Sequence, residues 1–411
     1  MDILNTTRDM EALFGGYELC RTQTSQIKQL REKLEDSSIT VAVIGQFKRG
    51  KTTLVNEILG EELLPVGIVP ITAAVTRITY GEPEVQVIFQ NGLCETVEPS
   101  ELSAYISEQE NHDNALGVAE VELHVSSEFL RSGVVLVDTP GVGSAHEKNS
   151  RAAYDFVRES DAVIFMLSVD SPINQIEIDF LKRVGKYAGK FYFLVNKVDL
   201  IDEKELSEYM DYCHGLLSKL TGSREIRLLA VSAKKGRGVE ELKRAISEDI
   251  REESREIMTE SVRRKLLELL NNTTSQIRSY RTVLNMAPNV FHSRFREIQG
   301  MLEDLRKQKE EIDPQETFPV TELNEEKHYL QGKVRELFEI DYYYDIHRVD
   351  REETLDAVAY AERAEALYTE LEQTLNAIFM YKEENTYAVA RRIEDLNILI
   401  REMGKLKKQL E

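Results

Sequence analysis

A glycine-rich segment near the start of the chain has the residue types and spacing of a phosphate-binding loop. The segment reads Gly45-Gln46-Phe47-Lys48-Arg49-Gly50-Lys51-Thr52. It matches the pattern G-x-x-x-x-G-K-[ST], in which backbone N–H groups surround phosphate, the lysine binds the β- and γ-phosphates, and the hydroxyl binds Mg²⁺. The apolar run Thr40–Ile44 precedes it and the predicted helix Thr53–Leu59 follows, as the pattern requires. We therefore predict that Gly45 to Thr53 bind a nucleotide, with a chance glycine-rich turn as the alternative.

A second element, Asp138-Thr139-Pro140-Gly141, follows the apolar run Val134–Val137. An acidic side chain at the end of a buried strand suits an outer position in the coordination of Mg²⁺. Gly141 has no side chain to obstruct its N–H group, so this group can approach the γ-phosphate closely. Because Asp-x-Pro-Gly is also an ordinary turn sequence, this element predicts a nucleotide site only in combination with the other elements.

The third element, Asn196-Lys197-Val198-Asp199, follows the predicted strand Phe191–Val195 and has the residues that select guanine. A buried Asp199 carboxylate would accept hydrogen bonds from the ring N–H and the exocyclic amine of guanine. Adenine offers no such pair of donors, so ATP would leave the carboxylate unpaired. We expect Asn196 to brace the loop and the aliphatic stem of Lys197 to lie over the base.

The fourth element, Ser232-Ala233-Lys234, follows the predicted strand Arg227–Val231, and its Ala233 N–H is predicted to donate to the guanine oxygen. Each of the four elements lies at the carboxyl end of a predicted strand. Ligands bind at this edge of open α/β sheets. The order and placement of the four elements predict GTP or GDP with Mg²⁺ as the bound cofactors.

A threonine that responds to the γ-phosphate is expected between the first and second elements. Thr72 lies 20 positions beyond Thr52, and we predict that it completes the Mg²⁺ coordination when the γ-phosphate is present. Thr76 is the rival for this role, and an ordinary strand threonine is the alternative. Thr52, Thr72 and Asp138 are thus the predicted metal residues.

The pattern along the chain predicts a mainly parallel α/β domain in three layers, followed by an extended all-α region. Short β-rich runs alternate with amphipathic stretches from 39 to 245, and several of the runs are apolar throughout, as in strands buried on both faces. We predict an N-terminal neck helix at 1–38, a GTPase domain at 39–245 and a helical neck and trunk at 246–411, in which 250–286 and 355–411 join the N-terminal helix. The helical periodicity predicts one long helix at 240–285 and helices at 290–312 and 321–340. It also predicts a tyrosine-rich bend at 341–350 and a helical run at 351–410 that is interrupted near 383–386.

The chain resembles the dynamin superfamily, specifically the bacterial dynamin-like proteins. The resemblance rests on the first three elements above and on Leu64-Pro65 followed by Pro70-Ile71-Thr72-Ala73, and it covers about residues 1–285. It implies a P-loop GTPase head, a neck bundle made from the flanking helices and activation by dimerisation of two heads across their nucleotides. It also implies higher oligomers or a paired dynamin-like partner.

Catalysis is predicted to consist of positioning and charge stabilisation, with Lys51, Thr72 and Gly141 around the γ-phosphate. Val142, which follows the second element, cannot orient water as a glutamine would. Lys48 stands where related large GTPases place a residue that acts in cis, and we predict that it supplies the missing charge. A solvated lysine is the alternative for Lys48, and a solvated side chain is the favoured interpretation of Arg49.

Composition limits the partners and the location of the protein. Hydrophobic residues make up 42% of the 411 residues, which is typical of a globular chain. A formal net charge of −21 repels nucleic acid and anionic lipid on average, so we expect no nucleic-acid partner. Three scattered cysteines and the lack of a recognisable signal peptide favour the cytoplasm, with peripheral contact to the cytoplasmic face of the membrane.

Two functions remain open from the sequence. The first is a mechanochemical dynamin-like GTPase, whose arm contacts lipid through the basic run at 261–300 or through the aromatic residues Phe338 and Tyr342 to Tyr344. A solvated face or a partner for the acidic segment 345–370 is the favoured interpretation of the basic run, and core packing is the favoured role of the aromatic residues. The second function is a cytosolic regulatory or assembly-factor GTPase that acts on a protein or ribonucleoprotein.

Overall fold

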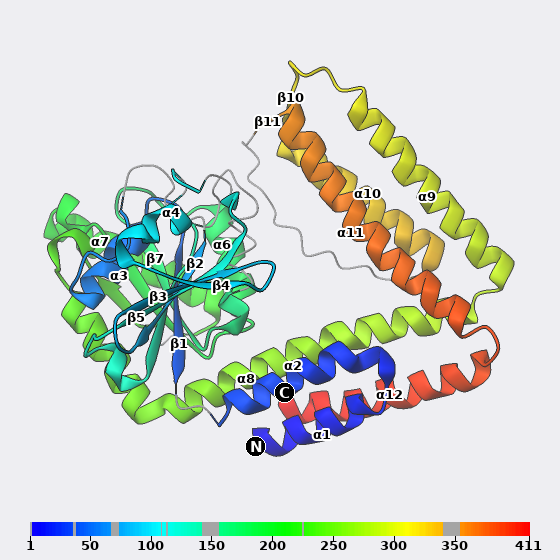
Figure 1. The fold of residues 1–411 in the computed structure, drawn as a ribbon, viewed down its shortest axis with the longest axis horizontal. Coiled ribbons are helices and arrows are strands. Elements are labelled where there is room, and N and C mark those ends of the chain that lie inside the picture. The colour runs from blue at the N-terminus through cyan, green and yellow to red at the C-terminus, as the bar shows by residue number, and fades with distance from the viewer. Residues whose placement is uncertain are drawn as a thin grey trace. The chain divides into compact units, whose positions relative to one another are not determined.

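The computed structural model describes residues 2–35, 38–66, 74–107, 109–111, 114–141, 156–223, 226–339 and 354–411. The chain divides into two compact units. One is the segment Gln29–Leu266, and the other combines Met1–Lys28 with Leu267–Glu411. The segment Gln29–Leu266 contains a nine-stranded sheet, and the other unit is mostly helical (Figure 1).

The first unit is built on a sheet of nine strands in the order β4-β3-β5-β2-β6-β1-β7-β8-β9. Five neighbouring strands at one side of this order run parallel: β6 (Val134–Asp138), β1 (Ile39–Gly45), β7 (Ala162–Ser168), β8 (Lys190–Asn196) and β9 (Leu228–Ala230). Their carboxyl ends therefore meet at one edge of the sheet. The remaining strands are β2 (Val75–Tyr80), β3 (Glu84–Phe89), β4 (Cys94–Val97) and β5 (Val118–Val125). Strand β2 is antiparallel to β6, so the parallel order stops there.

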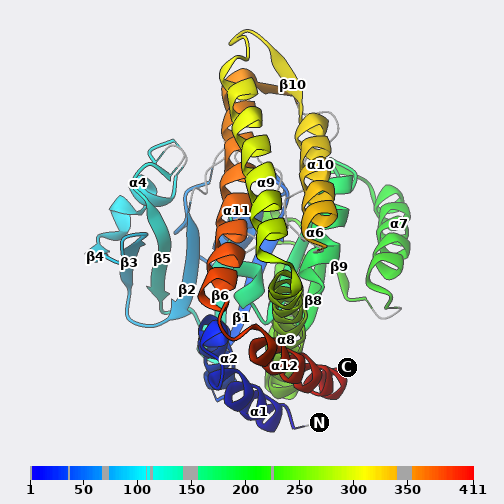
Figure 2. The same ribbon diagram turned by 90° about the vertical axis from the view of Figure 1, so that its right-hand side faces the viewer.

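Helices cover both faces of this sheet because the apolar side chains of its central strands point both ways. Phe165 of β7 packs in one core with Phe180 of α6 (Gln175–Val184) and Leu217 of α7 (Glu203–Thr221). On the other face, the Tyr192 hydroxyl of β8 donates to Asp249 of α8 (Val239–Asn285) at 2.9 Å. Helix α3 (Lys51–Leu59) follows β1 directly. The predicted three-layer, mainly parallel α/β fold is confirmed (Figures 1 and 2).

The second unit is helical. Its helices are α1 (Ile3–Gly15), the first part of α2 (Arg21–Lys33), the last part of α8, α9 (Pro288–Glu310), α10 (Val320–Phe338), α11 (Ala357–Glu384) and α12 (Val389–Leu410). Helices α9, α10 and α11 lie side by side (Figure 2), and a short antiparallel pair, β10 (Thr317–Pro319) with β11 (Thr354–Asp356), joins their ends. Lys382 of α11 is buried, and its ammonium donates to the carbonyls of Val283 at 2.7 Å and Met286 at 2.8 Å, where α8 ends. This lysine caps the carbonyls that the last turn of a helix leaves unpaired.

Shorter elements complete the described chain. They are helix α4 (Leu102–Ile106) and the 3₁₀ turns η1 (Glu18–Cys20), η2 (Pro99–Glu101), η4 (Leu130–Ser132), η5 (Val198–Leu200) and η6 (Ala233–Lys235).

The structure corrects some expected elements and confirms others. The prediction of a single N-terminal helix at 1–38 is wrong, because α1 ends at Gly15–Gly16 and Tyr17 has an extended backbone before α2 begins. The long helix at 240–285 and the interruption between α11 and α12 are confirmed. Strands β4, β10 and β11 were not predicted. The bend at 341–350, with Tyr342 to Tyr344, lies outside the described residues.

Several cations of the basic run at 261–300, which was considered as a lipid contact, have partners within the chain. Arg263 and Arg264 pair with Glu260, each at 2.7 Å. Lys265 is buried beside Asp161, and Arg294 donates to the carbonyl of Leu337 at 2.7 Å. Four of its cations are therefore bound within the chain. Within the described residues, none of the helices combines the length and apolar composition that a bilayer crossing requires.

Candidate nucleotide-binding site

The loop between β1 and α3 closes on the side chain of Lys51. The Lys51 ammonium donates to the carbonyls of Gly45 at 3.1 Å and Gln46 at 3.3 Å. Gly50 precedes the helix with φ +91°, a left-handed conformation that favours glycine. Burial lowers the pKa of Lys51 to about 8, against the opposing effect of Asp138. A buried ammonium at a helix N-terminus is suited to receive a polyphosphate.

Asp138 at the end of β6 lies next to the first turn of α3. The Thr52 hydroxyl donates to Asp138 Oδ2 at 2.8 Å, and Asp138 Oδ1 is buried without a hydrogen-bond partner among the described residues. Burial raises the pKa of this carboxyl to about 6, although Lys51 and Thr52 act in the opposite direction. Hydroxyl and carboxylate oxygens are the ligands that Mg²⁺ takes in proteins, so an unsatisfied carboxylate oxygen at this place fits the ion.

Asn196 at the end of β8 connects the phosphate-binding loop to the fourth element. Its amide donates to the carbonyl of Arg49 at 2.8 Å and accepts from the Ala233 N–H at 3.0 Å. A Cβ on Gly50 would lie 2.6 Å from the Asn196 amide nitrogen, so only glycine leaves room for this contact. Gly141 is equally close to the loop, since a Cβ there would lie 3.0 Å from the backbone of Phe47. The four elements therefore interlock at the edge formed by the parallel strands.

The Ala233 N–H makes a different hydrogen bond from the one that the sequence predicted. It was predicted to donate to the guanine oxygen, but in this structure it donates to Asn196, so a base would have to share it. Ser232 and Ala233 are buried, and Lys234 is exposed.

Asp199 is exposed at the surface, and the expectation that it is buried is wrong. Asp199 lies in the 3₁₀ turn η5, which begins directly after Lys197. Lys197 has a left-handed backbone conformation with φ +62°, and this conformation changes the direction of the chain before Asp199. The Ser232 hydroxyl donates to Asp199 Oδ1 at 2.6 Å, and this bond lowers the pKa of the carboxyl. Asp199 is therefore an anion with one oxygen held in place. The Lys197 ammonium pairs with Asp170 at 2.6 Å.

The middle of the phosphate-binding loop has two cations in opposite environments. Lys48 is exposed, has φ +66°, and its ammonium lies 5.3 Å from the centre of the Phe47 ring. Arg49 is only 2% exposed and binds Glu177 through two nitrogens, at 2.9 and 2.7 Å. The interpretation of Arg49 as a solvated side chain is wrong, because the loop directs this guanidinium into the protein.

The other predicted residues of the loop lie beside these cations. Gln46 accepts a hydrogen bond from the amide of Asn174 at 3.0 Å, and Thr53 is half-buried in the first turn of α3.

Comparison with known proteins shows which family this domain resembles. The family model described as "Dynamin family" matches residues 41–199, which contain three of the four elements. The segment 41–199 is similar to the dynamin family. The predicted resemblance to the dynamin superfamily is thus confirmed for this segment.

Individual known proteins match part of the length of this chain. A protein of Caldicellulosiruptor sp. (strain Rt8B.4), named only "Uncharacterized protein in xynA 3′ region", is 39% identical over 206 residues, which cover 50% of this chain and 51% of that protein. Dynamin-like protein A of Bacillus subtilis (strain 168) is 24% identical over 293 residues, covering 54% of this chain and 24% of that protein. The chain thus spans about half or less of these two relatives. A solved structure of an oligomerised bacterial dynamin pair aligns with a TM-score of 0.46 and 18% identity, over 98% of this chain and 79% of that one.

The switch threonine stays a prediction. Thr72 lies outside the described residues, as does Val142. Its rival Thr76 is fully buried, lies opposite Asp138 in the pairing of β2 with β6, and its hydroxyl has no partner among the described residues. The structure thus brings Thr76 to the same place as the predicted metal residues.

Sequence reasoning missed the polar segment that links β7 to α6. Ser168, Asp170, Asn174 and Glu177 all contact one of the four elements or a residue bound to one. The signal available was the placement of Ser168 and Asp170 at the end of an apolar strand run, where the other functional residues also lie.

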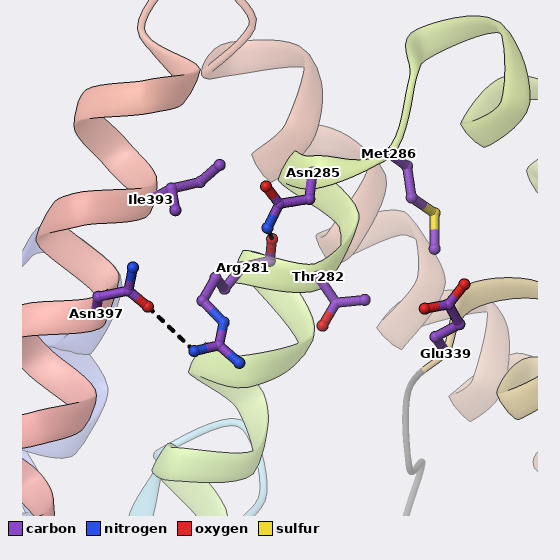
Figure 3. A pocket seen from close by; sticks show the side chains of 7 residues that line it. All are labelled: Arg281, Thr282, Asn285, Met286, Glu339, Ile393 and Asn397. Carbon is purple, nitrogen blue, oxygen red and sulfur yellow. Dashed lines mark hydrogen bonds between the residues drawn. The ribbon is translucent and has the colours of Figure 1, made fainter.

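A cleft in the helical unit has a different character (Figure 3). It measures about 600 Å³ and is lined by Arg281, Thr282, Asn285, Met286, Glu339, Ile393 and Asn397. Arg281 donates to Asn397 at 3.1 Å across it. The described residues that line this cleft include no glycine-rich loop and no hydroxyl that is hydrogen-bonded to a carboxylate, in contrast to the nucleotide site.

The raised pKa of Asp138 gives a testable pH dependence. Because the pKa is higher in the folded state than the ordinary value of 3.8, the folded protein is favoured when this carboxyl is protonated, and that stability is lost as the pH rises from about 4 to 6. Without nucleotide and Mg²⁺, Asp138→Asn should therefore be more stable than the wild type at pH 7.5, by up to about 3 kcal/mol, and by only about 1 kcal/mol at pH 4.5. Chemical denaturation of both proteins at the two pH values measures this difference. An equal difference at both would contradict the buried, partly unpaired state of the carboxylate.

Proposed function

We propose that this chain is a dynamin-like GTPase that binds GTP with Mg²⁺ where β1, β6, β8 and β9 end, and hydrolyses it when two heads dimerise. We further propose that hydrolysis acts through the helical arm in binding or remodelling a membrane. The observation that supports the site is the interlocking of the four elements through Asn196, Gly50 and Gly141.

In this proposal each side chain at the edge has one task. The N–H groups from Gly45 to Thr53, with the Lys51 ammonium, bind the phosphates, and Gly141 faces the γ-phosphate. Thr52, Asp138 and Thr72 hold Mg²⁺, which neutralises charge on the phosphates when bound. Asp199 accepts from guanine, Lys197 covers the base, and Ser232, Ala233 and Lys234 complete the base site.

Lys48 is proposed as the cation that stabilises charge on the γ-phosphate as water attacks it. Its exposure and left-handed backbone support this role, because neither burial nor an ion pair with a described residue fixes the ammonium. A second head placed over the nucleotide would exclude water and strengthen the interaction of such a cation with the phosphate. We infer from this that the active form is a homodimer of heads, alone or within a larger oligomer or a paired dynamin-like partner.

Lys48→Ala should separate binding from hydrolysis. GTP affinity should change little, whereas the rate per head at high protein concentration should fall about 10²-fold, the usual effect of removing one charge-stabilising group. Phosphate release over a protein concentration series measures this. Lys48→Arg should restore part of the stimulation, and the exposed Lys204→Ala should leave it unchanged. If Lys48→Ala keeps the full concentration dependence, the catalytic cation is another group.

The membrane part of the proposal is supported by the similarity to the dynamin family and by the extended helical unit. With four of its cations bound internally, the basic run at 261–300 is not the lipid contact we favour. We retain the proposed division into a neck at 1–38, a GTPase domain at 39–245 and a helical neck and trunk at 246–411, with the protein in the cytoplasm, peripheral on the membrane, and without a nucleic-acid partner.

Co-sedimentation with liposomes, combined with a GTPase assay, tests the membrane part. Vesicles of neutral and of anionic phospholipid should both be compared, because the net charge of −21 opposes anionic lipid. Binding to vesicles with faster hydrolysis supports the membrane function. Indifference to lipid of either kind favours the alternative, a cytosolic regulatory or assembly-factor GTPase that acts on a protein or ribonucleoprotein.

A further inference from the structure

The segment Ser168–Glu177, from the end of β7 to the first turn of α6, contacts both halves of the nucleotide site. On the phosphate side, Arg49 donates to the carbonyl of Ser171 at 2.6 Å and to that of Pro172 at 3.2 Å. On the base side, Lys197 pairs with Asp170 at 2.6 Å. None of the roles proposed above uses this segment.

The phosphate side of the segment is held rigidly. The guanidinium of Arg49 is 2% exposed, Glu177 is fully buried, and their two parallel hydrogen bonds measure 2.9 and 2.7 Å. A bidentate pair of this kind fixes the orientation of both side chains. Breaking it would leave a buried charge without a partner, so Arg49 and Glu177 are poor positions for a selective test.

A chain of contacts continues from Arg49 to the base side. Arg49 Nη1 donates to Ser168 Oγ at 2.8 Å, and this hydroxyl donates to Asp170 Oδ1 at 2.5 Å. Asp170 Oδ2 accepts from Lys197 Nζ at 2.6 Å. Partial burial acts to raise the pKa of Asp170, but the hydrogen bonds from Lys197 and Ser168 outweigh it and hold the pKa below the usual value. The carboxylate is therefore charged at neutral pH and bound through both oxygens.

We propose that Asp170 is a positioning residue for guanine binding, because it fixes the ammonium of Lys197 and thereby the stem that covers the base. This inference rests on the proposed base site. A lysine side chain has many rotamers, and holding one of them before the ligand arrives removes the entropy that binding would otherwise lose. The contact of Ser168 with Arg49 ties the position of this lysine to the phosphate-binding loop.

The experiment compares ligands that do and do not have a base. Asp170 suits it because the side chain is 39% exposed, so Asp170→Asn leaves no deeply buried charge. GDP should bind about 3- to 10-fold more weakly to Asp170→Asn, the effect of one side chain that is no longer pre-organised. The affinity for tripolyphosphate with Mg²⁺ should stay within about 2-fold, whereas general damage to the fold would weaken both ligands. Asp179→Asn, on α6 and bonded only to Gln175 and Lys182 in its described contacts, is the matched control and should change neither affinity.

A double-mutant cycle gives the decisive readout. In a Lys197→Met background, Asp170→Asn should have no further effect on GDP affinity, because its partner is already absent. Asp170→Ser provides a second variant if the asparagine protein is unstable. Unchanged GDP affinity in both Asp170 variants, equal losses for GDP and tripolyphosphate, or additive effects with Lys197→Met would each overturn the inference. If the Asp170 prediction fails, Asp199→Asn shows which part of the account is at fault. Unaltered guanine selectivity in Asp199→Asn would mean that the proposed base site is wrong. Altered selectivity would mean that only the role of Asp170 is wrong.

Discussion

Lys51→Ala is expected to abolish nucleotide binding at micromolar concentrations. The ammonium lies inside the loop between β1 and α3, within 3.3 Å of two of its carbonyls, at the place where a β- or γ-phosphate would replace those contacts. Two hydrogen bonds between charged groups contribute about 3–6 kcal/mol together, which corresponds to roughly a 10²- to 10⁴-fold loss of affinity. Titration with a fluorescent GDP measures the loss.

The folded state should survive this substitution. Burial already lowers the pKa of Lys51 to about 8, so removing the ammonium also removes an unfavourable buried charge. Thermal unfolding without nucleotide should therefore show a cooperative transition, and added GDP should no longer raise its midpoint. The exposed Lys204→Ala is the control. If Lys51→Ala binds GDP as tightly as the wild type, the loop between β1 and α3 is not part of the nucleotide-binding site.

Asp199→Asn is expected to change which base the protein selects. The carboxylate is held by Ser232 and has a lowered pKa, so it is charged and directed by one hydrogen bond before a base arrives. Replacing it by an amide removes one acceptor for the guanine N–H groups, and GTP affinity should fall by about 10²-fold or more. The amide can donate to the carbonyl that xanthine has in place of the guanine amine, so XTP should bind better than GTP.

Competition of GTP, XTP and ATP against a fluorescent nucleotide measures this change. ATP should remain a weak ligand of both proteins, since adenine offers neither donor pair nor carbonyl at that position. Asp211→Asn, an exposed change on α7, should leave all three affinities as in the wild type. Retained selectivity for GTP in Asp199→Asn would refute the assignment of this carboxylate.

The sequence was sufficient where local pattern decides the structure. The four elements follow strands whose apolar runs are visible, and parallel strands must bring their carboxyl ends to one edge, so Lys51, Asp138, Asn196 and Ser232 could be placed together without coordinates. The long helix α8 was predictable for the same reason, because its pattern has no proline or glycine over 47 residues.

Contacts between distant residues could not be read in this way. Arg49 and Glu177 are 128 positions apart, and nothing in the loop sequence shows that Arg49 points inward while its neighbour Lys48 points outward. The exposure of Asp199 depends on the left-handed turn at Lys197, which is a rare conformation for a lysine. The break between α1 and α2 was signalled by Gly15 and Gly16, but it was outweighed by the amphipathic pattern around them.

Phosphate release from GTP and from ATP, measured with wild-type protein and Lys51→Ala over a range of protein concentrations, tests the central claim most directly. The wild type should release phosphate from GTP and hardly from ATP, the rate per head should rise with protein concentration, and Lys51→Ala should be inactive. A rate per head that does not change with concentration, or equal hydrolysis of ATP, would contradict a GTP-selective site that is completed when two heads meet.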